Sequence, residues 1–417
     1  MTPEEKLQAL NKVLKLCGKA PFYHNRIPDR ALTALEEIKD IPLTTKEELR
    51  LASPFGLVCV PREELCQYHE SFGTTGEPVS TWLTREDLRD NARQITRCGV
   101  DFSKEDKVLV RFPYAISAVA HMVHTAAQLK GACVVPASAR SDVSPLPRII
   151  DLLRRLDVTV MACLPLQALL LAETAEMLGL RPDLDFPALR AVCTAGEPLA
   201  PGRREMLQSI WKTPVFDFYG MAEIGTAVVD CRFGRSHPLE EYFIFELLDD
   251  NFEAEVPTGA TGHLVVTTLN KRAAPMLRYL TGDRARKAAG KCRCGKDLHL
   301  EIRGRQEDII TTEGRVWDLW DLEDIVSGFA CRRYWAVGPG SPGLRFVVEE
   351  EKTGDAVGPE AIRGLEKKYG CKIDVEVVPR GTLYDRSELF AVSEVGKPRY
   401  IYTENEMRQR TYGGTKV

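Results

Sequence analysis

Between residues 106 and 220, short apolar runs typical of strands alternate with helical patterns. The predicted strands span 106–112, 133–137, 158–164, 189–196 and 214–220, and the predicted helices between them span 121–131, 145–157 and 166–179. Apolar strands separated by amphipathic helices pair in parallel and are covered on both faces. This alternation predicts an α/β fold, in which ligands bind in the loops at the carboxyl ends of the strands.

The pattern changes near residue 300. A further strand is predicted at 262–268, and a Gly- and Lys-rich loop follows at 287–297. Beyond it, short strands at 344–350 and 372–378 and a helix at 358–370 indicate a smaller α+β unit of ordinary domain size. We therefore predict a large N-terminal domain over residues 1–305 and a small C-terminal domain over residues 306–417.

Charge and hydropathy exclude several classes of protein. The chain has 56 Lys and Arg against 60 Asp and Glu, so it lacks the basic excess of a nucleic-acid or anionic-membrane surface. Its longest uncharged run, 112–129, holds proline, serine, threonine, glutamine and two histidines, and is too polar to cross a bilayer. The first ten residues lack the pattern of a secretory signal. We expect a cytoplasmic protein that binds neither nucleic acid nor membrane, with a homodimer as the commonest assembly.

The segment Ser71-Phe-Gly-Thr-Thr-Gly-Glu-Pro78 has the composition of a phosphate-binding loop. Gly73 and Gly76 allow the backbone to approach an anion closely, while Ser71, Thr74 and Thr75 supply hydroxyl groups. The segment lacks the lysine of a Walker loop, so it is not the common NTPase motif. Taken alone, it is equally compatible with an ordinary Gly/Thr turn.

Four further motifs follow this loop in order. They are Ala195-Gly-Glu-Pro198, Phe218-Tyr-Gly-Met-Ala-Glu-Ile-Gly225, Tyr279-Leu-Thr-Gly-Asp283 and Gly304-Arg305. In this order and at these spacings, the set resembles the adenylate-forming superfamily and, more narrowly, the phenylacetate–coenzyme A ligase family, over nearly the whole chain. The resemblance implies an ATP-dependent ligase that joins a carboxylic acid to AMP, releases pyrophosphate and passes the acyl group to coenzyme A. It also implies a large adenylation domain and a small, mobile C-terminal lid.

The resemblance assigns roles residue by residue. It places Mg²⁺ on Glu223, the ribose hydroxyls on Asp283 and Arg305, and the ATP phosphates and adenine on Ser71, Gly73, Thr74, Thr75, Gly76, Gly196, Glu197, Pro198, Asp217, Phe218, Tyr219, Gly220, Met221 and Ala222. The alternatives are a solvated helix start for Glu223 and a turn residue for Asp283. Phe72 and Ala222 stand where the family commonly has hydroxyl residues. Because one neutral hydrogen bond contributes about 1 kcal/mol, we expect an altered site rather than a dead one.

Two ligand pairs in separate loops indicate a metal site. Cys292 and Cys294 form one pair, and Cys231 and His237 form the other. Three thiolates and one imidazole suit a tetrahedral structural zinc, and some members of the family carry zinc in equivalent loops. Two alternatives remain at this point: His299 competes with His237 as the fourth ligand, and Cys231 is also compatible with a packed thiol.

In the predicted C-terminal domain, the resemblance assigns the catalytic lysine to Lys397 in Val-Gly-Lys-Pro-Arg-Tyr, where the alternative is an exposed lysine in a basic turn. It places Gly314 beside the pantetheine arm of coenzyme A and the hinge at 306–308. The segment 317–320, Trp-Asp-Leu-Trp, departs from the small, Asn- and Pro-containing stretch of the family. An amine, a hydroxyl or a carrier protein therefore stays open as the acceptor, as does a zinc-stabilised nucleotide-binding protein without turnover.

The acid pocket is expected after the strand at 106–112 and at the start of the next helix. Its predicted residues are Phe112, Tyr114, Ser117, His121, His124, Tyr219 and Gly220. Small side chains around Phe112 and Tyr114 favour a flat aromatic acid over a long acyl chain. His121 is equally compatible with a helix histidine that bonds the backbone, and the sequence does not specify the acid.

Overall fold

The computed structural model describes residues 1–416 apart from 72–76, 353, 355, 387–396 and 410–414, and it describes only the backbone of 397, 398, 415 and 416. The helices are α1 (Pro3–Cys17), α2 (Lys46–Ala52), α3 (Arg85–Ile95), α4 (Ala118–Leu129), α5 (Leu146–Arg155), α6 (Pro165–Met177), α7 (Pro201–Trp211), α8 (Leu319–Val326), α9 (Pro359–Tyr369) and α10 (Glu404–Gln409), with short 3-10 turns at Pro21–Tyr23, Leu35–Asp40 and Arg62–Glu64. The strands of the N-terminal part are β1 (Leu65–Glu70), β2 (Ser80–Thr84), β3 (Lys107–Val110), β4 (Cys133–Pro136), β5 (Val160–Cys163), β6 (Ala191–Thr194), β7 (Val215–Met221), β8 (Gly225–Asp230), β9 (Ser236–Pro238), β10 (Phe243–Leu248), β11 (Thr261–Thr268), β12 (Tyr279–Ala288) and β13 (His299–Arg305). Those that follow are β14 (Ile310–Thr312), β15 (Arg315–Trp317), β16 (Trp335–Pro339), β17 (Leu344–Glu349), β18 (Ile373–Val378), β19 (Lys397–Pro398) and β20 (Thr415–Lys416).

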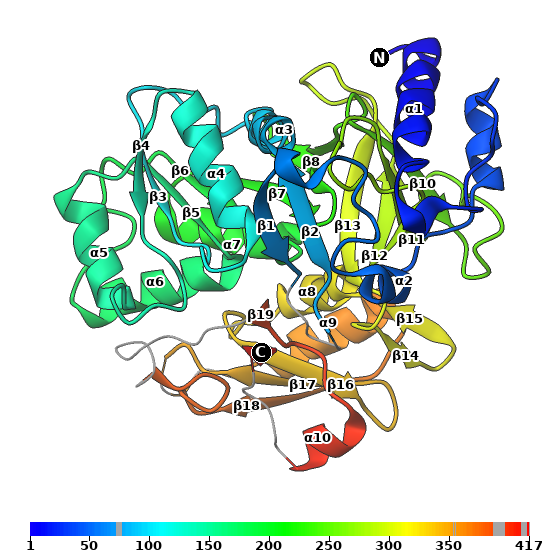
Figure 1. Cartoon of the computed structure of the whole chain (residues 1–417). Coiled ribbons are helices and arrows are strands. Elements are labelled where there is room, and N and C mark those ends of the chain that lie inside the picture. The colour runs from blue at the N-terminus through cyan, green and yellow to red at the C-terminus, as the bar shows by residue number, and fades with distance from the viewer. Residues whose placement is uncertain (72–76, 353, 355, 387–396, 410–414, 417) are drawn as a thin grey trace.

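The predicted alternation of strands and helices is confirmed, and its strands form one large sheet in the order β4-β3-β5-β6-β7-β8-β9 (Figure 1). Pairing is parallel from β4 to β7, whereas β8 and β9 extend the sheet in the antiparallel sense. Antiparallel neighbours need only a short connection, and residues 222–224 supply one between β7 and β8.

Successive residues of the central strands point to opposite faces of this sheet, which explains its two helical layers. Val108 and Val110 of β3 belong to the core that includes α3 and α4, whereas Leu109 belongs to the core that includes α5, α6 and α7. In β5, Val160 and Ala162 face the first core and Met161 faces the second. A strand that is buried on both faces has to be apolar at every position, as residues 108–110 of β3 and 160–163 of β5 are.

A second sheet carries the later motifs and is wholly antiparallel, in the order β10-β11-β12-β13. The predicted strand at 262–268 is β11. In the ladder between β12 and β13, Asp283 pairs directly with Arg305. The register of this sheet therefore brings together two side chains that lie 22 positions apart in the sequence.

The C-terminal region, residues 306–416, is built on the sheet β16-β17-β18 with α8 and α9, as predicted for a small α+β unit. It has a core of its own, which includes Trp317, Leu322 and Phe346. Tyr334 and Val347 instead join the core around α6 and α7. Figure 1 shows the strands β16, β17 and β18 of this region below α6 and α7, the helices that cover the large sheet on that side.

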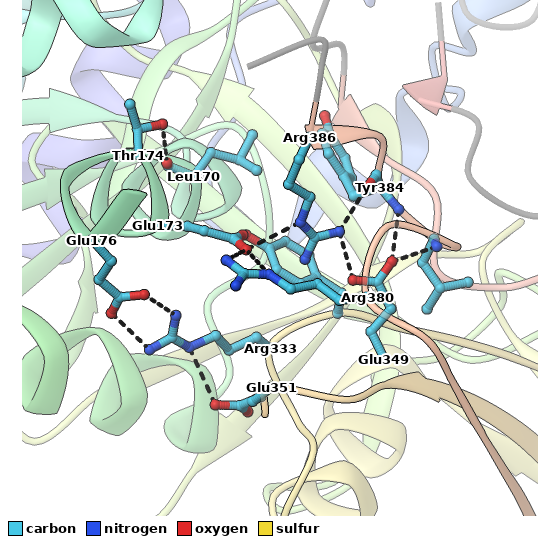
Figure 2. A network of polar contacts seen from close by, with 12 residues as sticks. Leu170, Glu173, Thr174, Glu176, Arg333, Glu349, Glu351, Arg380, Tyr384 and Arg386 are labelled. Carbon is cyan, nitrogen blue, oxygen red and sulfur yellow. Dashed lines mark hydrogen bonds and ion pairs between the residues drawn. The ribbon is translucent and has the colours of Figure 1, made fainter. Parts of the chain in front are cut away.

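Polar contacts between α6 and the C-terminal region surround one buried carboxylate (Figure 2). Glu173 of α6 is 1% exposed and accepts hydrogen bonds from Tyr334 Oη at 2.7 Å and Arg380 Nε at 2.7 Å. Arg386 Nε lies 3.1 Å from the same carboxylate. One turn away, Glu176 pairs with Arg333 at 2.9 Å. None of the helices in the described ranges is long and apolar enough to span a membrane.

Candidate active site

A cavity of about 250 Å³ lies where loops after β6 and β7, the second sheet and the C-terminal region meet. This is the carboxyl end of the parallel strands, where the α/β pattern predicts ligands. Its lining includes these predicted site residues: Ser71, Ser117, Gly196, Glu197, Pro198, Asp217, Phe218, Tyr219, Gly220, Met221, Ala222, Glu223, Asp283 and Arg305.

Glycines shape two of the loops that line the cavity. Gly196, just beyond β6, has φ 86°, a conformation that side chains with a Cβ rarely adopt. Gly220 lies where β7 meets β8, and a Cβ there would stand 2.2 Å from the carbonyl oxygen of Gly225. These positions leave the adjacent Glu197 and Tyr219 facing the cavity.

Tyr219, Asp283 and Arg305 form a polar cluster in the cavity wall. The Tyr219 hydroxyl donates to Asp283 Oδ2 at 2.5 Å, and Arg305 Nε lies 3.0 Å from Asp283 Oδ1. Burial, together with the negative charge of Asp283, raises the pKa of Tyr219, so the phenol keeps its proton. The Asp283 charge also raises the pKa of Arg305. The cluster thus offers one fixed carboxylate and one permanent cation, a combination suited to the hydroxyl groups of a sugar.

Glu223 lies in the turn between β7 and β8 and is 2% exposed. Its Oε1 accepts a hydrogen bond from the Tyr279 hydroxyl at 3.4 Å. Within the described ranges, no Lys, Arg or His nitrogen lies within 4.0 Å of this carboxylate. A buried carboxylate is costly without a cation, and one carboxylate with phosphate oxygens is a usual setting for Mg²⁺, so the residue fits that ion.

The predicted acid-pocket residues divide into two groups. Ser117, Tyr219 and Gly220 line the cavity, whereas Phe112, Tyr114, His121 and His124 are not among its described lining residues. Phe112 is 1% exposed in the core, and Tyr114 Oη lies 3.1 Å from His124 Nδ1. His121 Nε2 donates to the Tyr114 carbonyl at 3.0 Å, which is the backbone-bonded alternative foreseen for it.

The face of α4 that lines the cavity is not the one that carries His121 and His124, and the sequence did not identify it. Ala118, Val119 and Met122 line the cavity there. Positions 118 and 122 are one helical turn apart, so they share a face, while 121 and 124 share a different one. Ser117, the N-cap residue directly before α4, lines the cavity with this face of the helix.

The predicted zinc ligands Cys231, His237, Cys292 and Cys294 place one donor atom each within 4.8 Å of the others. The Cys231 and Cys292 sulfurs are 3.6 Å apart, and Cys294 Sγ lies 3.3 Å from His237 Nε2. A tetrahedral zinc with Zn–S bonds of about 2.3 Å sets neighbouring sulfurs about 3.8 Å apart, so this donor set fits the ion. A disulfide would need about 2.05 Å.

The two histidines near this cluster have different partners. His237 Nδ1 donates to the Leu298 carbonyl at 2.7 Å. This bond leaves Nε2 without a proton, so its lone pair is available on the side of the cysteines. His299 Nε2 lies 2.7 Å from the Gly290 carbonyl, and His299 is not part of the four-residue group. Among the described residues, His237 is therefore the histidine that completes the cluster.

Residues 45–271, more than half of the chain, match the family model described as AMP-binding enzyme. A phenylacetate–coenzyme A ligase of Thermus thermophilus is 31% identical over 336 residues, covering 75% of this chain and 73% of that protein. The chain is a phenylacetate–coenzyme A ligase-like member of the AMP-binding enzyme family. A second phenylacetate–coenzyme A ligase, from Pseudomonas putida, is 31% identical over 307 residues, covering 70% of this chain and 68% of that one.

Solved structures share the fold of this AMP-binding enzyme. A 2-hydroxyisobutyryl-CoA ligase in the postadenylation state aligns with a TM-score of 0.85 at 22% identity, covering 98% of this chain and 92% of that chain. The same ligase in the thioesterification state aligns with a TM-score of 0.69 at 22% identity, over 98% and 91% of the two chains.

Several predicted site residues of this AMP-binding enzyme are not among the described residues that line the cavity. Gly73, Thr74, Thr75 and Gly76 lie outside the described residues. The backbone of Lys397 lies in β19, two residues before the cavity-lining Arg399, and its side chain is outside the described part. Gly314 lies in the turn between β14 and β15 and is not among the lining residues.

Lys46 is a cavity residue that the sequence reasoning missed. It is the first residue of α2, whose start is fixed by a capping box between Thr45 and Glu48. Burial lowers the pKa of its amine, against the opposing charge of Glu223. The Thr-Thr-Lys-Glu-Glu-Leu signal marks a helix start clearly, but only the packing of α2 on β12 shows that this start faces the cavity.

Proposed function

We propose that this protein is an AMP-forming acid–coenzyme A ligase that activates a small aromatic carboxylic acid with ATP and Mg²⁺. One observation carries the proposal: Glu223 and the Tyr219–Asp283–Arg305 cluster line a single cavity with Arg399, which comes from the C-terminal region. This arrangement places a candidate metal ligand, a candidate sugar-binding pair and a cationic side chain from the C-terminal region around one cavity. A scaffold protein would have no need of that combination.

In the first half-reaction, a carboxylate oxygen of the acid attacks the α-phosphorus of ATP and pyrophosphate leaves. Asp283 and Arg305 hold the ribose, so that the α-phosphate faces the acid. Glu223 would hold Mg²⁺, which neutralises phosphate charge when bound. Lys397 is proposed to bring its ammonium to the same phosphate as negative charge develops.

In the second half-reaction, the coenzyme A sulfur attacks the acyl carbonyl and AMP leaves. We place the change between the two steps at a hinge over 306–308, directly after Arg305. The domains would then be residues 1–305 and 306–417. The higher TM-score to the postadenylation structure than to the thioesterification structure supports an arrangement suited to the first step here.

The lining of the cavity supports a compact acid. Ala118, Val119, Met122 and Met221 form an apolar wall of the cavity. Apolar side chains on α4 and in the loop after β7 suit contact with the faces of an aromatic ring. We therefore propose an aromatic acid of about one ring, in contact with α4 and the loop after β7.

We further propose that Cys231, His237, Cys292 and Cys294 bind one structural zinc ion. Four protein ligands leave no position for a reactive water, so the ion would hold loops rather than take part in the chemistry. The ligands come from the segments after β8, in β9 and between β12 and β13. The ion would thus join the edge of the large sheet to the loop that precedes Arg305.

The function is tested by incubating the protein with ATP, Mg²⁺, coenzyme A and single aromatic acids, and following AMP and thioester by mass spectrometry. E223Q is the matched control, because it keeps the shape of the side chain and removes the charge. Thioester and AMP in equal amounts, lost in E223Q, support the proposal. AMP with an ester, amide or carrier-bound acyl group instead of a thioester would show a different acceptor. The absence of any acid-dependent AMP would contradict the proposal.

A further inference from the structure

A buried lysine lies behind the turn that carries Glu223. Lys271 is 6% exposed and follows β11. Its Nζ donates to the backbone carbonyl of Glu223, and the carbonyl of Ala222 lies 3.5 Å from the same atom. Among the described residues, no carboxylate oxygen lies within 4.0 Å of this ammonium. A buried cation with carbonyl partners and no close ion pair needs an explanation, because its burial is costly.

The backbone around Lys271 is fixed independently of Glu223. The Asp87 carboxylate accepts hydrogen bonds from the backbone nitrogens of Arg272 at 2.7 Å and Ala273 at 3.0 Å. Asn270 Nδ2 donates to Asp90 Oδ2 at 3.0 Å. Both acidic residues belong to α3, so this helix anchors the residues on either side of Lys271.

The turn that carries Glu223 is a short connection between two strands, and it places Ala222 and Glu223 at the cavity. Residues 222–224 link β7 to the antiparallel β8, and the next residues are fixed by α3, where Gln94 Oε1 accepts from the Thr226 nitrogen at 3.0 Å. The Lys271 ammonium contacts the carbonyl oxygens of Ala222 and Glu223. These two carbonyls belong to the peptide groups on either side of the Glu223 α-carbon. The orientation of these peptides sets the direction in which the Glu223 side chain leaves the backbone.

We propose that Lys271 is a positioning residue for the divalent cation: it holds the carbonyls of Ala222 and Glu223 and so fixes the Glu223 carboxylate where the metal–ATP complex binds. This inference rests on the proposed role of Glu223. Groups that orient a metal ligand from behind typically change metal affinity by about 10- to 100-fold when removed. Hydrogen bonds from charged donors are also stronger than neutral ones, which suits an ammonium for this task.

The test measures metal binding directly rather than turnover. Mn²⁺ binding in the presence of ATP is followed by electron paramagnetic resonance for wild type, K271M, K271R and the surface control K19M. Methionine keeps the apolar stem without a donor, and arginine keeps both charge and donors. We expect K271M to weaken Mn²⁺ binding about tenfold or more, while K271R and K19M stay within about threefold of wild type. If K271M does not fold, K271Q replaces it with the same expectation.

A second readout separates positioning from mere stability. The binding of ATP without metal should be unchanged in K271M, while the Mg²⁺ concentration that gives half-maximal AMP formation rises in parallel with the Mn²⁺ dissociation constant. Wild-type Mn²⁺ affinity in K271M, or equal losses in K271R and K271M, would overturn the inference. If wild type shows no ATP-dependent Mn²⁺ binding, the proposed function fails instead, and that result is distinct.

Discussion

Replacing Glu173 with glutamine removes the negative charge at the centre of the contact between α6 and the C-terminal region. In the wild type, this carboxylate accepts from Tyr334 and Arg380 and pairs with Arg386 (Figure 2). Burial disfavours its charge, but the Arg386 charge and the hydrogen bonds from Tyr334, Arg380 and Arg386 outweigh burial and hold the pKa of Glu173 below its ordinary value. The substitution therefore acts on a group that is ionised at neutral pH.

The size of the effect follows from the exposure of each partner. Breaking a fully buried ion pair costs about 3–5 kcal/mol, whereas an exposed pair contributes about 0–1 kcal/mol. The Glu173 side chain is 2% exposed and that of Arg386 is 14% exposed, but that of Arg380 is 44% exposed. Arg386 also keeps Glu349 at 2.6 Å as a partner. We therefore expect E173Q to weaken the docking of the C-terminal region on α6 by about 2–3 kcal/mol, which is less than the cost of breaking a fully buried ion pair.

Hydrogen–deuterium exchange measures this directly, because opening of the contact exposes the backbone of α6 and β16. A loss of 2–3 kcal/mol corresponds to about 30- to 150-fold faster exchange at these amides. E176Q is the matched control on the same helix: Glu176 pairs with Arg333, but its side chain is 38% exposed, so the change should stay below about fivefold. Equal exchange in E173Q and E176Q would refute the reasoning that burial makes Glu173 the stronger contact.

Three further outcomes are expected. The lowered pKa of Glu173 means that its contribution to stability is fully present above the ordinary glutamate pKa and is lost as pH falls through the lowered value; the stability difference between wild type and E173Q should therefore shrink steadily as the pH falls below about 4.3 in a urea-unfolding series, and a constant difference would contradict it. Metal analysis should find about one zinc per chain, and C292S should lose it and lower the melting temperature; an unchanged melting temperature in a metal-free protein would contradict the structural role. K397A should reduce adenylate formation steeply while ATP binding persists, and unchanged AMP release in K397A would move the catalytic role to another residue.

The architecture could be predicted from the sequence because its strands are buried on both faces. Met161 and Ala162 lie on opposite sides of one strand, and both have to be apolar, so the run stands out against the helices around it. The antiparallel extension by β8 and β9 had no such signal. It depends on the short turn at Glu223, which a sequence pattern does not distinguish from an ordinary loop.

The candidate site was predictable where a motif carries the residues and not where packing does. The register between β12 and β13 joins Asp283 to Arg305, and both belong to motifs. Lys46 and Lys271 reach the same region from a helix start and from the segment after β11. For these two lysines only the tertiary arrangement indicates a role in the site. The local sequence around each one predicts a helix start or a loop whether or not the lysine is present.

The phase of α4 explains why only some of the predicted acid-pocket residues line the cavity. His121 and His124 were predicted to line the acid pocket, but the helix begins at Ala118 and turns the face with Ala118 and Met122 toward the cavity. A shift of one position rotates a helical side chain by about 100°, so the phase of the helix decides which of its residues line the cavity.

The most direct test of the central claim is one incubation of the full-length protein with ATP, Mg²⁺, coenzyme A and a pool of substituted aromatic acids, read by mass spectrometry beside the E223Q variant. The account predicts a single dominant acyl–coenzyme A mass with an equal amount of AMP, both absent in E223Q. Neither AMP nor an acyl product, with the aromatic pool and then with a pool of short aliphatic acids, would contradict it.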